Sequence, residues 1–179
     1  MNRPVLVLMV LVASVSFGTT LLAVDVAQLS QSAELIVVGT VRSSTARFTL
    51  DGRRIVTDTQ IDVREVLKGK PEGTKVVVMQ AGGIVGAVGQ RVEGTATFTV
   101  GEEVLVFLDR SGATRFEVTG MVQGKFRIER SSDGRAVYAI PEGAPATMLV
   151  DAARHETASA LKPMPLQELK ARISAAAQR

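Results

Sequence analysis

The stretch 54–69, with the sequence RIVTDTQIDVREVLKG, alternates with the period of two that a β-strand requires. Its residues divide into an apolar and threonine series, Ile55, Thr57, Thr59, Ile61 and Val63, and an opposite series, Val56, Asp58, Gln60, Asp62 and Arg64. The phase changes at Glu65, after which Val66 takes the apolar side, and a residue inserted into a strand in this way forms a β-bulge. The pattern predicts one long, strongly bent strand, which suits a barrel.

Short strands follow one another along most of the remaining chain. Residues 104–108, VLVFL, are apolar throughout, which predicts a central strand buried on both faces. Gly39 interrupts another apolar run and marks a bulge, a bend or a close backbone approach. Further strands are predicted at 35–44, 74–80, 115–123, 124–130 and 134–140, with turns at 46–54, 68–73 and 131–134. About seven short strands at regular spacing predict a mainly β fold, either an antiparallel β-barrel or a β-sandwich.

A helix is predicted at each end of this strand-rich region. Residues 25–34 read as a short helix that Asp25 caps, with Val26, Leu29 and Ala33 on one face. The segment 165–179 reads as a C-terminal helix with Pro165 in its first turn. Its apolar stripe comprises Leu166, Leu169, Ile173 and Ala177. The expected organisation is a β-barrel domain at 25–140, a proline-containing connecting arm at 141–164 and the helix at 165–179.

The N-terminus has the layout of a secretory signal peptide. Residues 5–18, VLVLMVLVASVSFG, carry no charge, follow the positively charged Arg3 and end in small residues. We predict a signal peptide at 1–18 with cleavage after Gly18, or as late as Ala23, and hence a periplasmic or extracellular protein. The alternative is an uncleaved membrane anchor, because a bilayer span needs about 20 apolar residues and the run can extend to Val24. A membrane contact is expected only in that case.

Composition argues against several kinds of chemistry. The chain has no Cys, which excludes thiolate metal sites and thiol catalysis. Its net charge of +3 comes from charges that alternate in sign, so no nucleic-acid partner is predicted. Aromatic residues are 4% of the chain and Trp is absent, which leaves few stacking platforms for single strands or sugars. His155 is the one histidine, too few for a zinc site, so neither a metal nor a cofactor is predicted.

A glycine cluster at 81–94 is the most unusual local feature. The segment AGGIVGAVGQRVEG lacks the spacing of a phosphate-binding or dinucleotide-binding loop, and we predict no regular element there. One interpretation is a partner-binding loop that uses exposed backbone N–H groups; its candidate residues are Gly82, Gly83, Gly86, Gly89 and Gln90. The other is a mobile or strained surface loop, such as a flap over the barrel.

Neighbouring Glu102 and Glu103 offer no acid–base pair. In a strand they would point to opposite faces, and a turn before the buried strand is the expected location.

The order of motifs over 33–108 resembles a known group. The segments SAELIVVGTV, TDTQIDVREVLKGK, VVVMQAGG and FTVGEEVLVFL are similar to uncharacterised secreted bacterial proteins and, more distantly, to netrin modules and tissue inhibitors of metalloproteinases. The matching residues are Gly39, Val41, Val63, Val66, Lys68, Gly69, Phe98, Gly101, Glu102, Leu105, Val106 and Phe107. The resemblance implies an OB-like antiparallel β-barrel. Those inhibitors chelate zinc through an N-terminal Cys that this chain lacks, so their mechanism does not transfer.

The sequence thus predicts an exported, non-catalytic binding or accessory protein of the cell envelope, with an unknown protein or peptide as partner. A protease-inhibitor-like barrel without the metal-chelating Cys is one alternative. An enzyme of unknown class is another, although the chain supplies no recognisable catalytic set. A carbohydrate- or oligonucleotide-binding barrel is disfavoured by the scarcity of aromatic residues.

Overall fold

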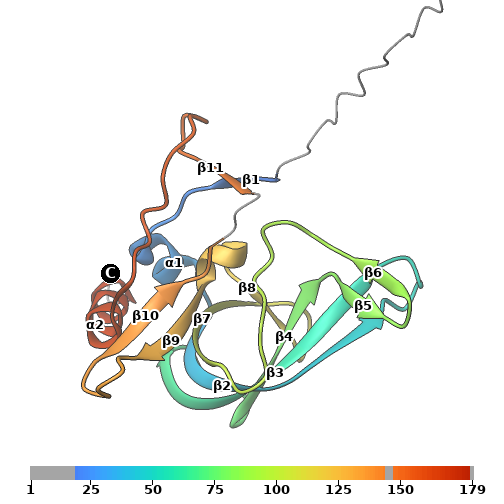
Figure 1. The fold of residues 1–179 in the computed structure, drawn as a ribbon, viewed down its shortest axis with the longest axis horizontal. Coiled ribbons are helices and arrows are strands. Elements are labelled where there is room, and N and C mark those ends of the chain that lie inside the picture. Colours follow the sequence, from blue (N-terminus) through green and yellow to red (C-terminus); the bar gives the residue numbers. More distant parts are fainter. Residues whose placement is uncertain (1–18, 144–146, 178–179) are drawn as a thin grey trace, which may run out of the picture.

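Five strands close a barrel, which confirms the prediction of a mainly β, OB-like fold (Figure 1). The structure is a computed structural model that describes residues 19–143 and 147–177. Each barrel strand pairs with the next in the order β7, β2, β3, β4 and β8, and β8 pairs back with β7. The strand bounds are Leu35–Phe48 for β2, Ile55–Lys68 for β3, Lys75–Ala81 for β4, Glu103–Arg110 for β7 and Phe116–Val118 for β8. Neighbours are antiparallel except β4 and β8, which meet in parallel.

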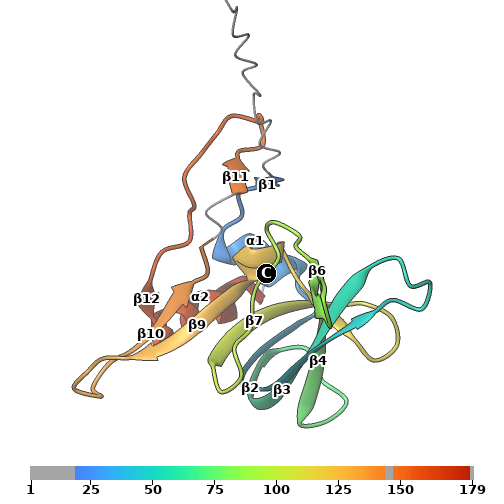
Figure 2. The same ribbon diagram turned by 45° about the vertical axis from the view of Figure 1, so that its right-hand side comes forward.

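The sheet continues beyond the barrel from β7. Strands β9 (Lys125–Arg130), β10 (Val137–Pro141) and β12 (Met164–Pro165) extend it, and the helices α1 (Val26–Ser32) and α2 (Leu166–Ala177) contact each other beside it (Figure 2). The remaining elements are β1 (Thr19–Leu22), β5 (Gly83–Val85), β6 (Val88–Gln90), the 3₁₀-helix η1 (Met121–Gly124) and β11 (Thr147–Val150). β1 and β11 form a separate parallel pair.

Strand β7 is buried on both faces, as its sequence predicts, because it serves two cores. Val104, Val106 and Leu108 lie in the cluster that fills the barrel. Leu105 and Phe107 point the other way, into a cluster shared with α1, α2 and β9. All five side chains are fully buried. A continuous apolar strand is therefore the sequence signature of a sheet covered on both sides.

The long strand β3 bends where its alternation changes, but one residue is misassigned. The register with β2 shifts between Ile36 and Val37 and again between Val38 and Gly39. These two irregularities leave Arg64 and Leu67 without direct partners in the ladder. The prediction that Val66 takes the apolar side is wrong, since Val66 is 41% exposed and Leu67 packs against the helices instead. The sequence pattern revealed one insertion, whereas the strand contains two.

Gly39 is required by close backbone approach at this bend. A Cβ atom built there would lie 2.4 Å from the backbone oxygen of Asp62. The observed irregularity confirms the interpretation of Gly39 as a bulge or a close approach.

Both predicted helices form. Asp25 caps α1 by a reciprocal pair of hydrogen bonds: its carboxylate accepts from Gln28 N, and the Gln28 side chain accepts from Asp25 N, each at 2.8 Å. The buried residues of α2 are Leu166, Leu169, Ile173 and Ala176. Ala177, expected in that stripe, is the last helical residue and is exposed, while Ala176 takes the buried position.

Three other boundaries differ from the prediction. β2 runs to Phe48, which pairs with Ile55, so the first hairpin turn is shorter than 46–54. The strand expected over 115–123 ends at Val118, because Gly120 adopts φ +67° and η1 follows. The arm at 141–164 includes β11 and the start of β12. The predicted signal peptide, 1–18, lies outside the described residues.

Among the described residues, neither helix is long and apolar enough to cross a membrane.

Candidate functional site

The glycine segment forms a hairpin, so the prediction of no regular element there is wrong. β5 and β6 pair antiparallel from Gly83↔Gln90 to Val85↔Val88, which leaves a two-residue turn at Gly86 and Ala87. Gly86 has φ +60°, as the first residue of a tight hairpin turn requires. The hairpin lies beside the ends of β2 and β3 (Figure 1). A two-residue turn that begins with glycine, Gly86, and is flanked by Val85 and Val88 is a hairpin signal. The other glycines of the segment made this signal hard to recognise in the sequence.

Gly82 and Gly83 fix this hairpin to the barrel. Gly82 N donates to Ile55 O at 2.8 Å, and Gly82 O accepts from the Thr57 hydroxyl at 2.7 Å. A Cβ atom on Gly83, which has φ +138°, would lie 2.5 Å from Thr57 Oγ1 and 2.8 Å from Ala46 Cβ. These two glycines are therefore needed for conformation and close packing.

Gly89 and Gln90 differ from the other candidate residues and from each other. The amide oxygen of Gln90 accepts from Ile55 N at 2.8 Å, which is a structural contact. Gly89 has no positive φ, and the nearest atom to a Cβ built there, Ile84 Cγ1, is 3.8 Å away. Gly89 is thus a hairpin glycine that can carry a side chain without strain.

A groove of about 700 Å³ lies beside the hairpin. Its lining includes Ser44 of β2 and Thr57 of β3, the hairpin residues Gly89 and Gln90, and the loop 91–98. All the predicted partner-binding residues except Gly86 line this groove. Half of its lining residues are glycine, serine or threonine, and these small residues leave the backbone accessible to an extended chain.

A second groove, of about 790 Å³, adjoins the first and is more apolar. The two share Gln80, Ala81, Val92 and Thr95 in their linings. The second groove adds Leu50, Met79 and Met121 among its lining residues. Methionine side chains adapt to irregular apolar surfaces, so this part suits a side chain of variable shape.

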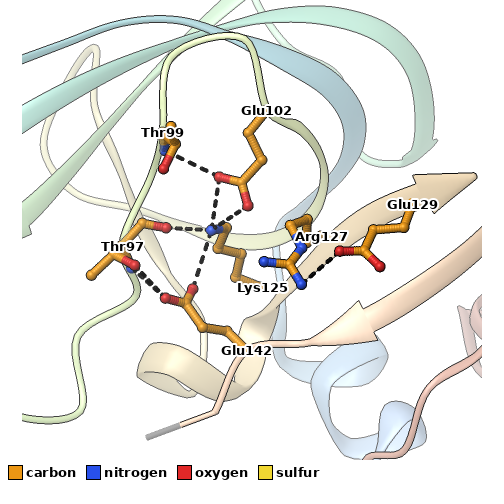
Figure 3. Close-up of polar contacts among 7 residues, drawn as sticks. All are labelled: Thr97, Thr99, Glu102, Lys125, Arg127, Glu129 and Glu142. Atoms are coloured by element: carbon orange, nitrogen blue, oxygen red, sulfur yellow. Dashed lines mark hydrogen bonds and ion pairs between the residues drawn. The ribbon is translucent and has the colours of Figure 1, made fainter.

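A buried lysine fastens the loop that walls the first groove (Figure 3). Lys125 begins β9 and its side chain is 4% exposed. Its Nζ lies 2.9 Å from Glu102 Oε1 and 3.2 Å from Glu142 Oε2, and it donates to the backbone oxygen of Thr97. The same Nζ lies 4.8 Å from the ring centre of Phe98, the last residue of the loop 91–98.

Lys125 Nζ donates hydrogen bonds to Thr97 O and to both carboxylate oxygens of Glu102, while its contact with Glu142 is an ion pair. Glu142 in turn accepts from Thr97 N at 3.0 Å and from Thr97 Oγ1 at 2.5 Å. The cluster therefore connects the loop, β9 and the end of β10 through one cation. We interpret it as a structural clamp that sets the shape of the groove.

Glu102 and Glu103 bind different partners. Glu102 faces Lys125, whereas Glu103 pairs with Arg64 at 2.5 Å and with Arg130 at 2.9 Å. The pKa of Glu103 is lowered from its usual value of 4.5, and the largest cause is the hydrogen bond from Arg130. Burial of the carboxylate raises the pKa in opposition, and the hydrogen bond from Arg64 lowers it further. The stabilisation from Glu103 is therefore present above pH 4.5 and is lost as the pH falls through the lowered pKa.

His155 lies in the arm and lines neither groove. Its side chain is 81% exposed, with Nδ1 3.6 Å from Asp151 Oδ2, which agrees with a solvated residue. Within the described ranges, no group of three or more His, Cys, Asp or Glu residues is placed to hold a metal ion.

Comparison with models of known protein families finds no match, and comparison with curated proteins finds none. The resemblance to netrin-like modules therefore remains a prediction from the sequence motifs.

Replacing Gly83 by Ala should destabilise the protein, whereas the same change at Gly89 should not. We expect Gly83→Ala to lower the free energy of unfolding by roughly 2–4 kcal/mol, since positive φ and overpacking both oppose a methyl group there. Gly89→Ala should stay within about 0.5 kcal/mol. Urea unfolding of the two variants measures both values, and equal losses would contradict the separation of roles.

Proposed function

We propose that this chain is an exported, non-catalytic binding protein that receives an extended segment of a protein or peptide in the groove beside the β5–β6 hairpin. The observation that carries the proposal is an open strand edge at a groove. β6 pairs only with β5 among the described strands, and its residues Gly89 and Gln90 line the groove of about 700 Å³. An unpaired edge presents backbone N–H and C=O groups to which an incoming strand can bind.

The adjoining apolar groove supports the same function. A strand added at β6 places alternate side chains on opposite sides, so some of them can enter a neighbouring pocket. Leu50, Met79 and Met121 would contact such side chains. Backbone hydrogen bonds would then supply affinity, and the apolar groove would supply selectivity for a hydrophobic residue.

The polar groups near the groove support binding better than catalysis. Lys125, the most buried charge among the described residues, already hydrogen-bonds to Thr97 and Glu102 and pairs with Glu142 within the protein. Two hydroxyl groups in the groove lining, those of Ser44 and Thr59, lie 3.2 Å from each other, and His155 does not line the groove. The Thr97 hydroxyl lies 2.5 Å from the Glu142 carboxylate, but Lys125 holds that carboxylate in the clamp, so we assign this pair a structural role rather than that of a nucleophile and its base.

A library of unstructured ten-residue peptides tests the proposal directly. We expect selection against the mature chain to enrich peptides that share an apolar residue and that shift amide resonances of residues 82–98. Gly89→Trp should weaken the selected peptides at least tenfold, about 1.4 kcal/mol, because its side chain would enter the groove without backbone strain. Isothermal calorimetry measures the affinities.

Gly73→Trp is the matched control. Gly73 has no atom within 4 Å of a built Cβ and lies outside both groove linings, so this variant should bind within twofold of the parent. Equal affinity for the two tryptophan variants would reject the groove as the binding site.

A further inference from the structure

Two hairpin tips at one end of the barrel expose apolar side chains. The β2–β3 turn carries Leu50, which is fully exposed, and Phe48 at the end of β2 is 42% exposed. On the β5–β6 hairpin, Ile84 and Val88 are 75% and 53% exposed. β5 contacts both β2 and β3, so the two hairpins lie side by side, at the end of the barrel away from the helices (Figure 1). Burial in the protein explains none of these four side chains, and exposed apolar groups gathered in this way mark an interaction surface.

The β2–β3 turn holds Leu50 outward in an ordered loop. Thr49 N donates to Arg54 O at 2.8 Å. The Asp51 carboxylate accepts from the Thr49 hydroxyl at 2.5 Å and from Arg53 N at 3.2 Å. Because these contacts already fix the turn, its backbone loses little further freedom when Leu50 is buried against a partner.

The same two tips carry most of the protein's net positive charge. Residues 47–54 and 82–93 contain four arginines against two acidic residues, a net charge of +2, while the whole chain of 179 residues has +3. Arg53 and Arg54 are exposed, and among the described residues neither side chain has an ion-pair partner. Guanidinium groups bind phosphate oxygens in a bidentate manner, so these arginines suit a surface that presents phosphate.

We infer that the two tips are a membrane-binding surface that sets the barrel on a bilayer containing anionic phospholipid. Leu50 and Ile84 would enter the boundary between headgroups and acyl chains, and Arg53 and Arg54 would bind phosphates. Projecting apolar tips beside arginines fit this broad, flat partner, whereas an extended peptide fits the grooves between them. The contact needs no residue before Thr19, so it differs from the N-terminal anchor considered in the sequence, and it goes beyond the proposed peptide binding.

Vesicle sedimentation tests the inference on a chain that begins at Thr19. This chain keeps every described element and lacks the apolar segment 5–18, which could bind lipid by itself. We expect it to sediment with phosphatidylcholine vesicles that contain about 30% phosphatidylglycerol, and far less with phosphatidylcholine alone. Leu50→Ser together with Ile84→Ser should lower the partition coefficient by roughly tenfold. Absence of sedimentation with the anionic vesicles would overturn the inference.

Val100→Ser together with Met148→Ser is the matched apolar control. These side chains are 61% and 47% exposed but lie outside both tips, so this variant should partition within about twofold of the parent. Equal losses for the tip pair and the control pair would reject the tips as the membrane contact.

A second pair of variants tests the charges. Arg53→Gln together with Arg54→Gln should lower partitioning into the anionic vesicles by roughly tenfold. Arg135→Gln together with Lys162→Gln removes the same two charges from exposed positions elsewhere, and should have a clearly smaller effect. If the two pairs lose affinity equally, net charge alone drives binding and the assigned surface is wrong.

Site-directed labelling separates the membrane from the peptide as the partner of the tips. The chain has no Cys, so Leu50→Cys or Val100→Cys gives a single attachment point for a polarity-sensitive dye. Anionic vesicles should shift the emission of the dye at position 50 to shorter wavelength and leave that at position 100 unchanged. A response at position 50 to the selected peptides but not to vesicles would overturn the inference. Vesicle binding without peptide binding would instead support it and reject only the proposed peptide groove.

Discussion

Replacing Lys125 by Met is expected to lower the free energy of unfolding by roughly 3–5 kcal/mol, because breaking a buried ion pair leaves its partners uncompensated. Glu102 and Glu142, 11% and 19% exposed, would keep their charges without the cation between them. Chemical denaturation measured by circular dichroism gives the value. Adding Glu102→Gln and Glu142→Gln to the variant should recover part of the loss.

Arg127→Met is the matched control, two residues along the same strand. Arg127 pairs with Glu129 at 2.6 Å, but both side chains are about half exposed. Exposed ion pairs contribute little, so the expected change is below about 1 kcal/mol. Similar losses for Lys125→Met and Arg127→Met would disprove the clamp.

Phe107→Ala should cost roughly 3–5 kcal/mol from lost burial and the cavity that remains. Phe107 is fully buried, and its ring centre lies 6.0 Å from that of Phe126 in the helix-side core. Val66→Ala, on strand β3 of the same sheet, offers a control, since Val66 is 41% exposed. It should change stability by less than about 1 kcal/mol. Denaturant melts of both variants test the assignment, and comparable losses would mean that the strand faces are misassigned.

The strands could be predicted because burial leaves a regular trace in the sequence. VLVFL at 104–108 has no polar face, and the structure shows two cores meeting at that strand. Local signals were also sufficient for the Asp25 cap and for the bend near Glu65. The hairpin at 83–90 was missed partly because Gly83 is needed for close packing against Ala46 and Thr57, which are distant in the sequence.

The clamp could not be predicted for a related reason. One face of β9 carries the charged residues Lys125, Arg127 and Glu129, and the other face carries the buried Phe126 and Ile128. The sequence pattern does not distinguish Lys125 from the other two charged residues. Only the loop carrying Thr97 and Glu102 covers the first of them, and no local pattern records that contact. A buried charge whose partners come from two other segments is visible only in three dimensions.

Because β2 and β7 contribute side chains to two cores, the barrel cannot be transferred to another protein by itself. Ile36, Val38, Leu105 and Phe107 all face the helical layer, although they belong to barrel strands. A barrel copied without that layer would present a continuous apolar stripe to water and would tend to aggregate. The barrel therefore depends on both helices to cover this stripe, so a graft of the groove beside the β5–β6 hairpin into another scaffold must carry α1 and α2 with it.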